Sequence, residues 1–104
     1  MLRLKDNTIN FANLQPQILI ALQVAERVFN SFGKDCIITS ANDGKHSQRS
    51  LHYAGAAIDL RTRHLASQEQ AKDIASAIQG ALNQDFDVVL ESTHIHIEYQ
   101  PKRR

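Results

Sequence analysis

Two segments of the chain alternate between aliphatic and ionisable residues, and this alternation constrains the fold more than any other feature. Residues 56–61 read AAIDLR and residues 94–99 read HIHIEY. Successive side chains of a β-strand point to opposite faces, so each segment has an aliphatic face and a face with ionisable groups. Each strand can therefore bury its aliphatic face against helices and turn the other face toward a cleft.

Two amphipathic helices are predicted to cover that aliphatic face. The first begins at Leu14, with Asn13 as the N-cap, Pro16 in the first turn and Gly33 after the last turn. Its apolar residues recur at spacings of three or four: Leu14, Ile18, Leu22, Ala25, Phe29 and Phe32. The second follows a capping box formed by Ser67 and Gln70. Its apolar stripe is Ala71, Ile74, Ala75, Ile78 and Leu82.

The remaining strands are short. Residues 36–39 are rich in β-branched side chains, and residues 86–90 are joined to residues 94–99 by a tight turn at Ser92-Thr93. Leu2, Leu4 and Ile9 either form a weak strand or lie in a loop, and the polar residues 40–51 form a loop. These patterns predict an α+β fold: a small antiparallel or mixed sheet with two helices on one face, in a single domain spanning residues 1–104.

Composition excludes several classes of protein. The 104 residues are 42% hydrophobic and 22% charged, which is typical of a globular domain. No apolar run approaches the roughly 20 residues that span a bilayer, and the first segment lacks the apolar stretch of a signal peptide. We therefore expect no membrane span and synthesis into the cytoplasm. The net charge of +1 argues against a general nucleic-acid binder, and the single cysteine, Cys36, excludes an internal disulfide.

The ionisable face carries a combination of residues that suits zinc. Imidazole nitrogen and carboxylate oxygen bind zinc at roughly 2.0–2.2 Å, and catalytic sites use three protein ligands and a water. His52 and Asp59 could converge on one point, and a third imidazole from the neighbouring strand, His94 or His96, would complete the set. The metal would lower the pKa of the bound water. Glu91 is then suited to take the proton of that water.

Ordinary structural roles compete with this interpretation. The histidines of residues 94–99 could form a solvated face, and Asp59 could be a buried partner for Arg61 or Arg49. His64 has the pattern of an ordinary surface residue. Cys36 lies in an apolar strand, which favours an inert core thiol. Spacing alone does not decide between these roles and zinc binding.

Two ordered motifs resemble a known family. Residues 50–60, SLHYAGAAIDL, resemble the S-x-H-x-x-G-x-A-x-D motif of the zinc D-Ala-D-Ala carboxypeptidase family, and residues 91–96, ESTHIH, resemble its acidic residue followed by HxH. That family includes phage endolysin peptidases and peptidoglycan endopeptidases, and it shares its fold with the amino-terminal domain of hedgehog proteins. Residues 43–47, DGKHS, are similar to the hedgehog version. The resemblance extends from about residue 37 to residue 99.

The resemblance implies a role for each matching residue. It implies three zinc ligands: His52, Asp59 and His96. In members with a Glu-x-x-His motif the third ligand would instead be His94, whereas the HxH pair favours His96. It further implies Glu91 as the general base, His46 as a group that steadies the oxyanion of a tetrahedral intermediate, and His94 as a neighbour that positions water or substrate.

The function expected from this resemblance is zinc-dependent hydrolysis of peptidoglycan stem peptides or cross-links. The enzyme would be of the DD-carboxypeptidase or endopeptidase type and would act at the bacterial cell wall, as a phage-derived lytic enzyme or in cytoplasmic recycling. The alternative is a zinc-stabilised, hedgehog-like binding module without catalysis. A third reading is a small structural domain of a virion or tail whose histidines lie only on the surface.

Overall fold

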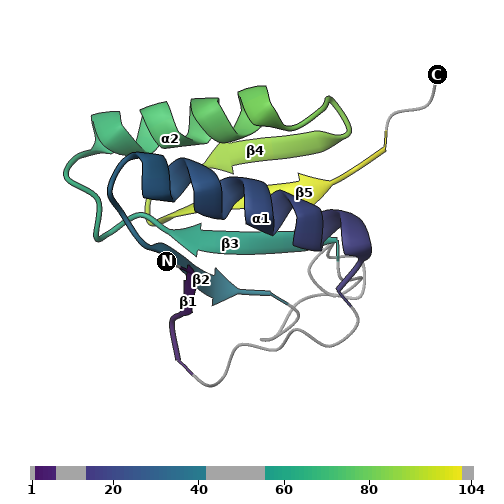
Figure 1. Ribbon diagram of the computed structural model, residues 1–104, viewed down its shortest axis with the longest axis horizontal. Coiled ribbons are helices and arrows are strands. Elements are labelled where there is room, and N and C mark those ends of the chain that lie inside the picture. Colours follow the sequence, from purple (N-terminus) through teal and green to yellow (C-terminus); the bar gives the residue numbers. More distant parts are fainter. Residues whose placement is uncertain (1, 7–13, 42–55, 102–104) are drawn as a thin grey trace.

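The computed structural model describes residues 2–6, 14–41 and 56–101, which form two helices and five strands (Figure 1). In chain order these are β1 (Leu2–Leu4), α1 (Pro16–Ser31), β2 (Cys36–Ser40), β3 (Ala57–Arg61), α2 (Gln68–Ala81), β4 (Phe86–Leu90) and β5 (His94–Tyr99).

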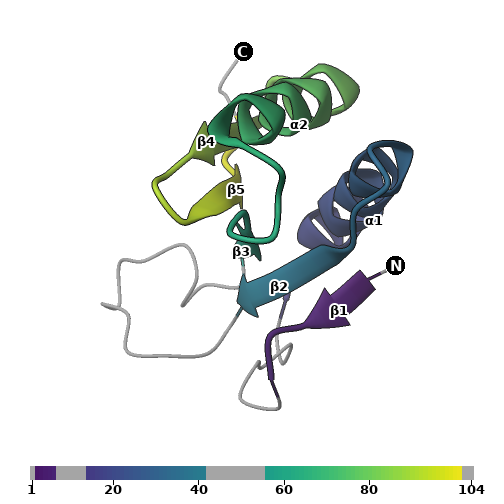
Figure 2. The ribbon, with the colours of Figure 1, turned by 90° about the vertical axis from the view of Figure 1, so that its left-hand side faces the viewer.

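The five strands form one mixed sheet in the order β1-β2-β3-β5-β4. The β1–β2 pair is parallel and the other three pairs are antiparallel. Both helices lie on the same face of the sheet (Figure 2). The predicted α+β architecture, a small sheet with two helices on one face, is therefore confirmed.

The core forms between the helices and the aliphatic face of the sheet. Ile58 of β3 and Ile95 and Ile97 of β5 are fully buried, as their alternation with ionisable residues predicts. Facing them are fully buried side chains from α1 and α2, which follow the predicted helical spacing: Ile18, Ala21, Ala25, Phe29, Ala71, Ile74 and Ile78. The aliphatic face of each strand is thus committed to the core, and the ionisable face is left for other contacts.

The ends of α1 were predicted only in part. The helix begins at Pro16 rather than Leu14, and its N-cap is Gln15, which makes no side-chain capping bond, so the expectation of Asn13 as the cap is wrong. Asn13 itself lies outside the described residues. Proline suits this place because the first helical N–H needs no partner within the helix. Gly33 follows the helix with φ of 73°, the left-handed conformation that favours glycine.

The cap of α2 is confirmed. The Ser67 hydroxyl accepts a hydrogen bond of 3.1 Å from the Gln70 backbone N–H. The Gln70 side chain accepts in turn from the N–H of Ala66, one residue before the N-cap. The two side chains therefore satisfy backbone N–H groups at the start of the helix and immediately before it.

The β4–β5 hairpin has the predicted bounds and turn. The Glu91 N–H donates a hydrogen bond of 2.8 Å to the carbonyl of His94, which closes the two-residue turn at Ser92 and Thr93. At the other edge of the sheet, Leu2 and Leu4 belong to a strand, whereas Ile9 and most of the predicted loop at residues 40–51 lie outside the described residues.

Candidate functional site

The ionisable side chains of β3 and β5 meet on the sheet face that points away from the helices, here called the open face. Asp59 is directly opposite His96 in the antiparallel pair, and Arg61 is directly opposite His94. Directly opposite residues of an antiparallel pair project to the same face. Two neighbouring rows of polar groups therefore cross these strands, one through Asp59 and the other through Arg61.

Asp59 contacts both histidines of β5. Its Oδ1 accepts a hydrogen bond of 2.7 Å from Nδ1 of His96 and lies 3.6 Å from Nε2 of His94. The side chains of Asp59 and His96 are 16% and 21% exposed. The contact is thus largely shielded from water, which strengthens its electrostatic component.

The second ring nitrogen of His96 also faces a carboxylate. Nε2 donates to Oε1 of Glu98 at 3.1 Å, on the same face of β5 two residues further on. The hydrogen bond to Asp59 is the main cause that raises the pKa of His96 above the ordinary 6.5, and the charges of Asp59 and Glu98 add to it, while burial opposes it. A carboxylate at each nitrogen favours the imidazolium form, in which both nitrogens are donors.

Glu91 lies at the edge of this cluster. The hydrogen bond from its N–H to the carbonyl of His94 places Glu91 opposite His94, one position beyond the pair formed by Leu90 and Ile95. The side chains of Leu90 and Ile95 face the core side of the sheet. By the pleat, the side chains of Glu91 and His94 share the open face. His96 is then the diagonal neighbour of Glu91, at about 7–8 Å between Cα atoms, which is within reach of a long side chain.

The structure brings four predicted site residues to one face: Asp59, Glu91, His94 and His96. The other two predicted residues, His46 and His52, lie outside the described residues. Within the described ranges 2–6, 14–41 and 56–101, no three His, Cys, Asp or Glu side chains are arranged to hold a metal ion. Any metal site here therefore needs a donor from elsewhere in the chain or from a bound molecule.

The donor chemistry of the Asp59–His96 pair fits zinc. Tetrahedral zinc with bonds of about 2.0–2.1 Å holds its nitrogen and oxygen donors roughly 3.4 Å apart. The Asp59 carboxylate is 2.7 Å from His96, which is shorter than that separation. It is 3.6 Å from His94, which is slightly longer. A cation between Asp59 and His96 would replace the proton on Nδ1 of His96, because a ligating imidazole must offer a lone pair.

Two residues of the described part were misjudged or missed by the sequence analysis. Glu98 was not assigned to the cluster, although residues two apart on a strand share a face. His64 is not an ordinary surface residue: its Nε2 lies 2.7 Å from the carbonyl of Asp35, and its ring stacks on Phe29. His64 is thus part of the packing beneath α1 and contributes nothing to the open face.

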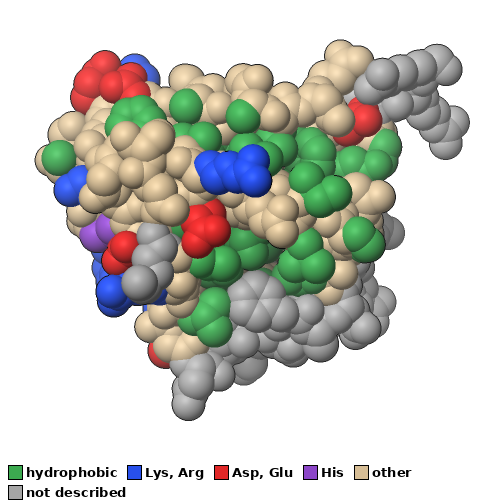
Figure 3. Space-filling model, viewed as in Figure 1, with side chains coloured by type: hydrophobic (Ala, Val, Ile, Leu, Met, Phe, Trp, Pro, Cys, Tyr) green, Lys and Arg blue, Asp and Glu red, His purple; other side chains and the backbone are tan. Residues whose placement is uncertain are grey.

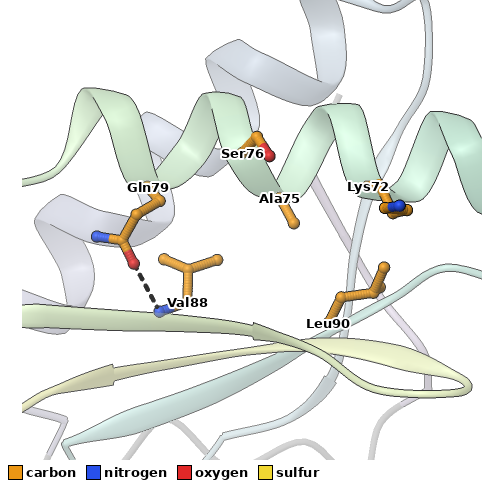
Figure 4. Close-up of a pocket in the computed structure, with 6 residues that line it drawn as sticks. All are labelled: Lys72, Ala75, Ser76, Gln79, Val88 and Leu90. Carbon is orange, nitrogen blue, oxygen red and sulfur yellow. Dashed lines mark hydrogen bonds between the residues drawn. The ribbon is translucent and has the colours of Figure 1, made fainter.

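A larger cavity lies elsewhere, in a groove between α2 and β4 (Figure 4). Its volume is about 420 Å³, and its lining residues are Lys72, Ala75, Ser76, Gln79, Val88 and Leu90. The Gln79 amide is used by the fold, since it accepts from the N–H of Val88 and donates to the carbonyl of Phe86. This groove therefore offers an apolar surface and few groups for chemistry.

On the helix side of the molecule, hydrophobic side chains are scattered over the surface (Figure 3). On α1, Leu19 and Ile20 are exposed. The described helices include none long and apolar enough to traverse a lipid bilayer.

Comparison of the chain with protein-family models, with curated proteins and with solved structures finds no match.

Proposed function

We propose that this protein is a zinc-dependent peptidase whose site is built on the open face around Asp59 and His96. The observation that carries the proposal is their cross-strand contact: a carboxylate oxygen and an imidazole nitrogen 2.7 Å apart on one shielded face. A carboxylate and an imidazole are two of the three ligand types of catalytic zinc sites. We assign the third ligand to His52, on the resemblance of residues 50–60.

Glu98 supports this assignment through the orientation of His96. Histidines that bind metals usually donate their second N–H to a carboxylate or carbonyl, which fixes the ring and raises its basicity. Glu98 accepts from Nε2 of His96. Nδ1, which faces Asp59, is then the nitrogen that would bind zinc after losing its proton. The same geometry favours His96 over His94 as the ligand from β5.

Glu91 is the proposed general base. When bound, zinc would polarise the scissile carbonyl and lower the pKa of an attacking water. Glu91, diagonal to His96 on the same face, would accept the proton of that water and return it to the leaving amine. His94, 3.6 Å from the Asp59 carboxylate, would orient water or substrate, and His46 would stabilise the oxyanion.

The substrate class is proposed from the two motifs rather than from the geometry. Residues 50–60 and 91–96 resemble peptidases that cut peptidoglycan, so we propose peptidoglycan stem peptides or cross-links as the substrate. The enzyme would then act at the bacterial cell wall.

The experiment that tests the function is digestion of purified peptidoglycan, followed by mass spectrometry of the released muropeptides. Three samples are compared: protein loaded with zinc, protein treated with a chelator, and chelated protein to which zinc is restored. The proposal predicts new peptide termini in the first and third samples only. Absence of cleavage from all peptidoglycan types tested, with zinc bound, would contradict it.

The role of Glu91 is tested by Glu91→Gln, with Glu69→Gln as the matched control. Glu69 lies in the first turn of α2, on the helix side. Loss of a general base lowers turnover by roughly 10²–10⁴-fold. Glu91→Gln should therefore keep zinc and lose cleavage, whereas Glu69→Gln should keep both. A Glu91→Gln protein that cuts as fast as the control would refute the assignment.

A non-catalytic, zinc-stabilised binding module is the second candidate. It is favoured by one observation: the Glu91 side chain is exposed, and among the described residues it makes no hydrogen bond or ion pair. A base held by no neighbour is less well positioned for catalysis. Stoichiometric zinc binding without any cleaved product would select this candidate over the peptidase.

A further inference from the structure

A second pocket, which is polar, lies on the open face next to the Asp59–His96 pair, and His94 lies between the two. Its volume is about 170 Å³. The residues that line it come from widely separated parts of the chain: Lys5, Thr39, Arg61, Arg63, Thr93 and His94. Three of these are lysine or arginine, two carry hydroxyl groups, and no carboxylate lines the pocket. Such a concentration of cationic donors in a hollow has no evident role in folding.

The pocket is built by neighbouring positions on four strands. Lys5 directly follows β1, and its N–H donates 2.8 Å to the carbonyl of Ile38, which places Lys5 beside Thr39 on β2. On β3, Arg61 is directly opposite His94 of β5. Thr39 lies at an irregularity of β2, between Ile38, which is opposite Leu60, and Ser40, which is opposite Asp59. Lys5 and Thr39 thus lie in a row next to that of Arg61 and His94, and residues of both rows line the pocket.

The turn beyond β3 adds the last two groups. The N–H of Thr62 donates to the carbonyl of Thr93 at 3.2 Å, which holds the end of β3 against the β4–β5 turn. Arg63 follows Thr62 in the chain, Thr93 carries the accepting carbonyl, and both residues line the pocket. The hairpin and the end of β3 thus form one wall, and Lys5 closes the opposite side.

The positive charge of the pocket is only partly balanced. Asp6 lies 3.9 Å from Nζ of Lys5, Asp59 lies 3.6 Å from Nε2 of His94, and Glu91 is beyond His94 in the same row. Arg61 and Arg63 form no ion pair within residues 2–6, 14–41 and 56–101. Two guanidinium groups lie beside a lysine, and no carboxylate lies between them. Such a group of cations is suited to bind an anion.

We propose that this pocket binds the phosphate group of a phosphorylated ligand. A phosphomonoester carries about −1.5 to −2 charges at neutral pH and three strong acceptor oxygens, which match the three cations of the pocket. The two hydroxyl groups already have partners, since Thr39 donates to the carbonyl of Asp59 at 3.4 Å and the Thr93 hydroxyl lies 3.2 Å from Nδ1 of His94. A carboxylate has one charge and two oxygens, and would leave the pocket with excess positive charge. The volume of about 170 Å³ is several times the roughly 30 Å³ that a water molecule occupies, so the five heavy atoms of a phosphate group fit.

The proposal is independent of zinc and of peptidase activity. It uses side chains of Lys5, Arg61 and Arg63, none of which is a proposed zinc ligand. Because phosphate can also bind directly to zinc, the test uses chelated protein. Binding of phosphate without metal separates this proposal from the proposed function, and either can fail alone.

The test is a calorimetric titration of the full chain with inorganic phosphate, in chelator and at low salt. Acetate serves as the single-charge comparison. We expect one saturable phosphate site, no saturable acetate site, and weaker binding as the ionic strength rises. In ¹⁵N–¹H spectra of the wild type, phosphate should shift the backbone signals of Arg61, Arg63 and Thr93.

The matched variants are Arg63→Gln and Arg27→Gln. Arg63 is exposed in the turn after β3, and Arg27 is exposed on α1, so neither substitution disturbs the core. Loss of one charge-assisted hydrogen bond weakens binding roughly tenfold or more. Arg63→Gln should show this loss and Arg27→Gln should not. No saturable phosphate binding, equal binding of acetate, equal loss in both variants, or spectral shifts away from the pocket would each overturn the proposal.

Discussion

Replacement of Asp59 by asparagine should lower the free energy of unfolding of the metal-free protein by about 1–1.5 kcal/mol, the difference between a hydrogen bond to a charged group and one to a neutral group. The asparagine has nearly the same volume, so the change removes charge rather than packing. The bond that loses its charge is 2.7 Å long, and its two side chains are 16% and 21% exposed. Solvent screening is therefore weaker than for a surface ion pair, whose typical value is below 1 kcal/mol.

The sign of the pH dependence follows from His96. Its pKa is raised in the folded protein, mainly by the hydrogen bond to Asp59. A raised folded-state pKa contributes stability that is fully present below the unfolded pKa of about 6.5 and is lost as the pH rises through the folded-state pKa. The cost of Asp59→Asn should therefore be larger at about pH 5.5 than at about pH 8.5.

The assay is urea denaturation in chelator at both pH values, with Asp73→Asn as the control. Asp73 is exposed on α2, so its replacement should cost less than about 0.5 kcal/mol. Equal losses for the two variants, or a loss from Asp59→Asn that grows toward alkaline pH, would refute the reasoning from the Asp59–His96 bond.

Two further predictions concern single side chains. Burial is the main cause that raises the pKa of Cys36 from 9.0 to about 12, so at a given pH the folded protein holds about a thousandfold less thiolate than an ordinary cysteine. Alkylation by iodoacetamide should be far slower in the native state than in urea, and similar rates would contradict the burial. Glu98→Gln removes the carboxylate at Nε2 of His96 and should weaken zinc binding by about 10–100-fold in competition with a chelating dye. Unchanged affinity would show that Glu98 does not orient the ligand.

The fold was predictable where the periodic pattern of a segment allows only one of its faces to pack in the core. The alternation in residues 94–99 placed Ile95 and Ile97 in the core and left the histidines on the other face, and the structure confirms this division. The Ser67 cap was likewise predictable because the capping bond is local. The start of α1 was not, because Asn13 is a favourable cap by residue type, while proline at the first helical position also begins a helix well.

The contacts of the site were less predictable than the faces. Alternation assigns Asp59 and His96 to polar faces, but only the placement of β5 beside β3, two strands that are not consecutive in the chain, makes them direct neighbours. Strand order depends on tertiary packing, which no local pattern contains. His64 was misjudged for the same reason, since its partners, Phe29 and the carbonyl of Asp35, come from a distant part of the chain.

The most direct test of the central claim is the zinc content of untagged protein, measured by mass spectrometry after loading with zinc and dialysis. A site that includes Asp59 and His96 predicts about one tightly held zinc per chain in the wild type and little in Asp59→Ala. Wild-type protein that keeps no zinc, or an Asp59→Ala protein that keeps as much as the wild type, would contradict the claim.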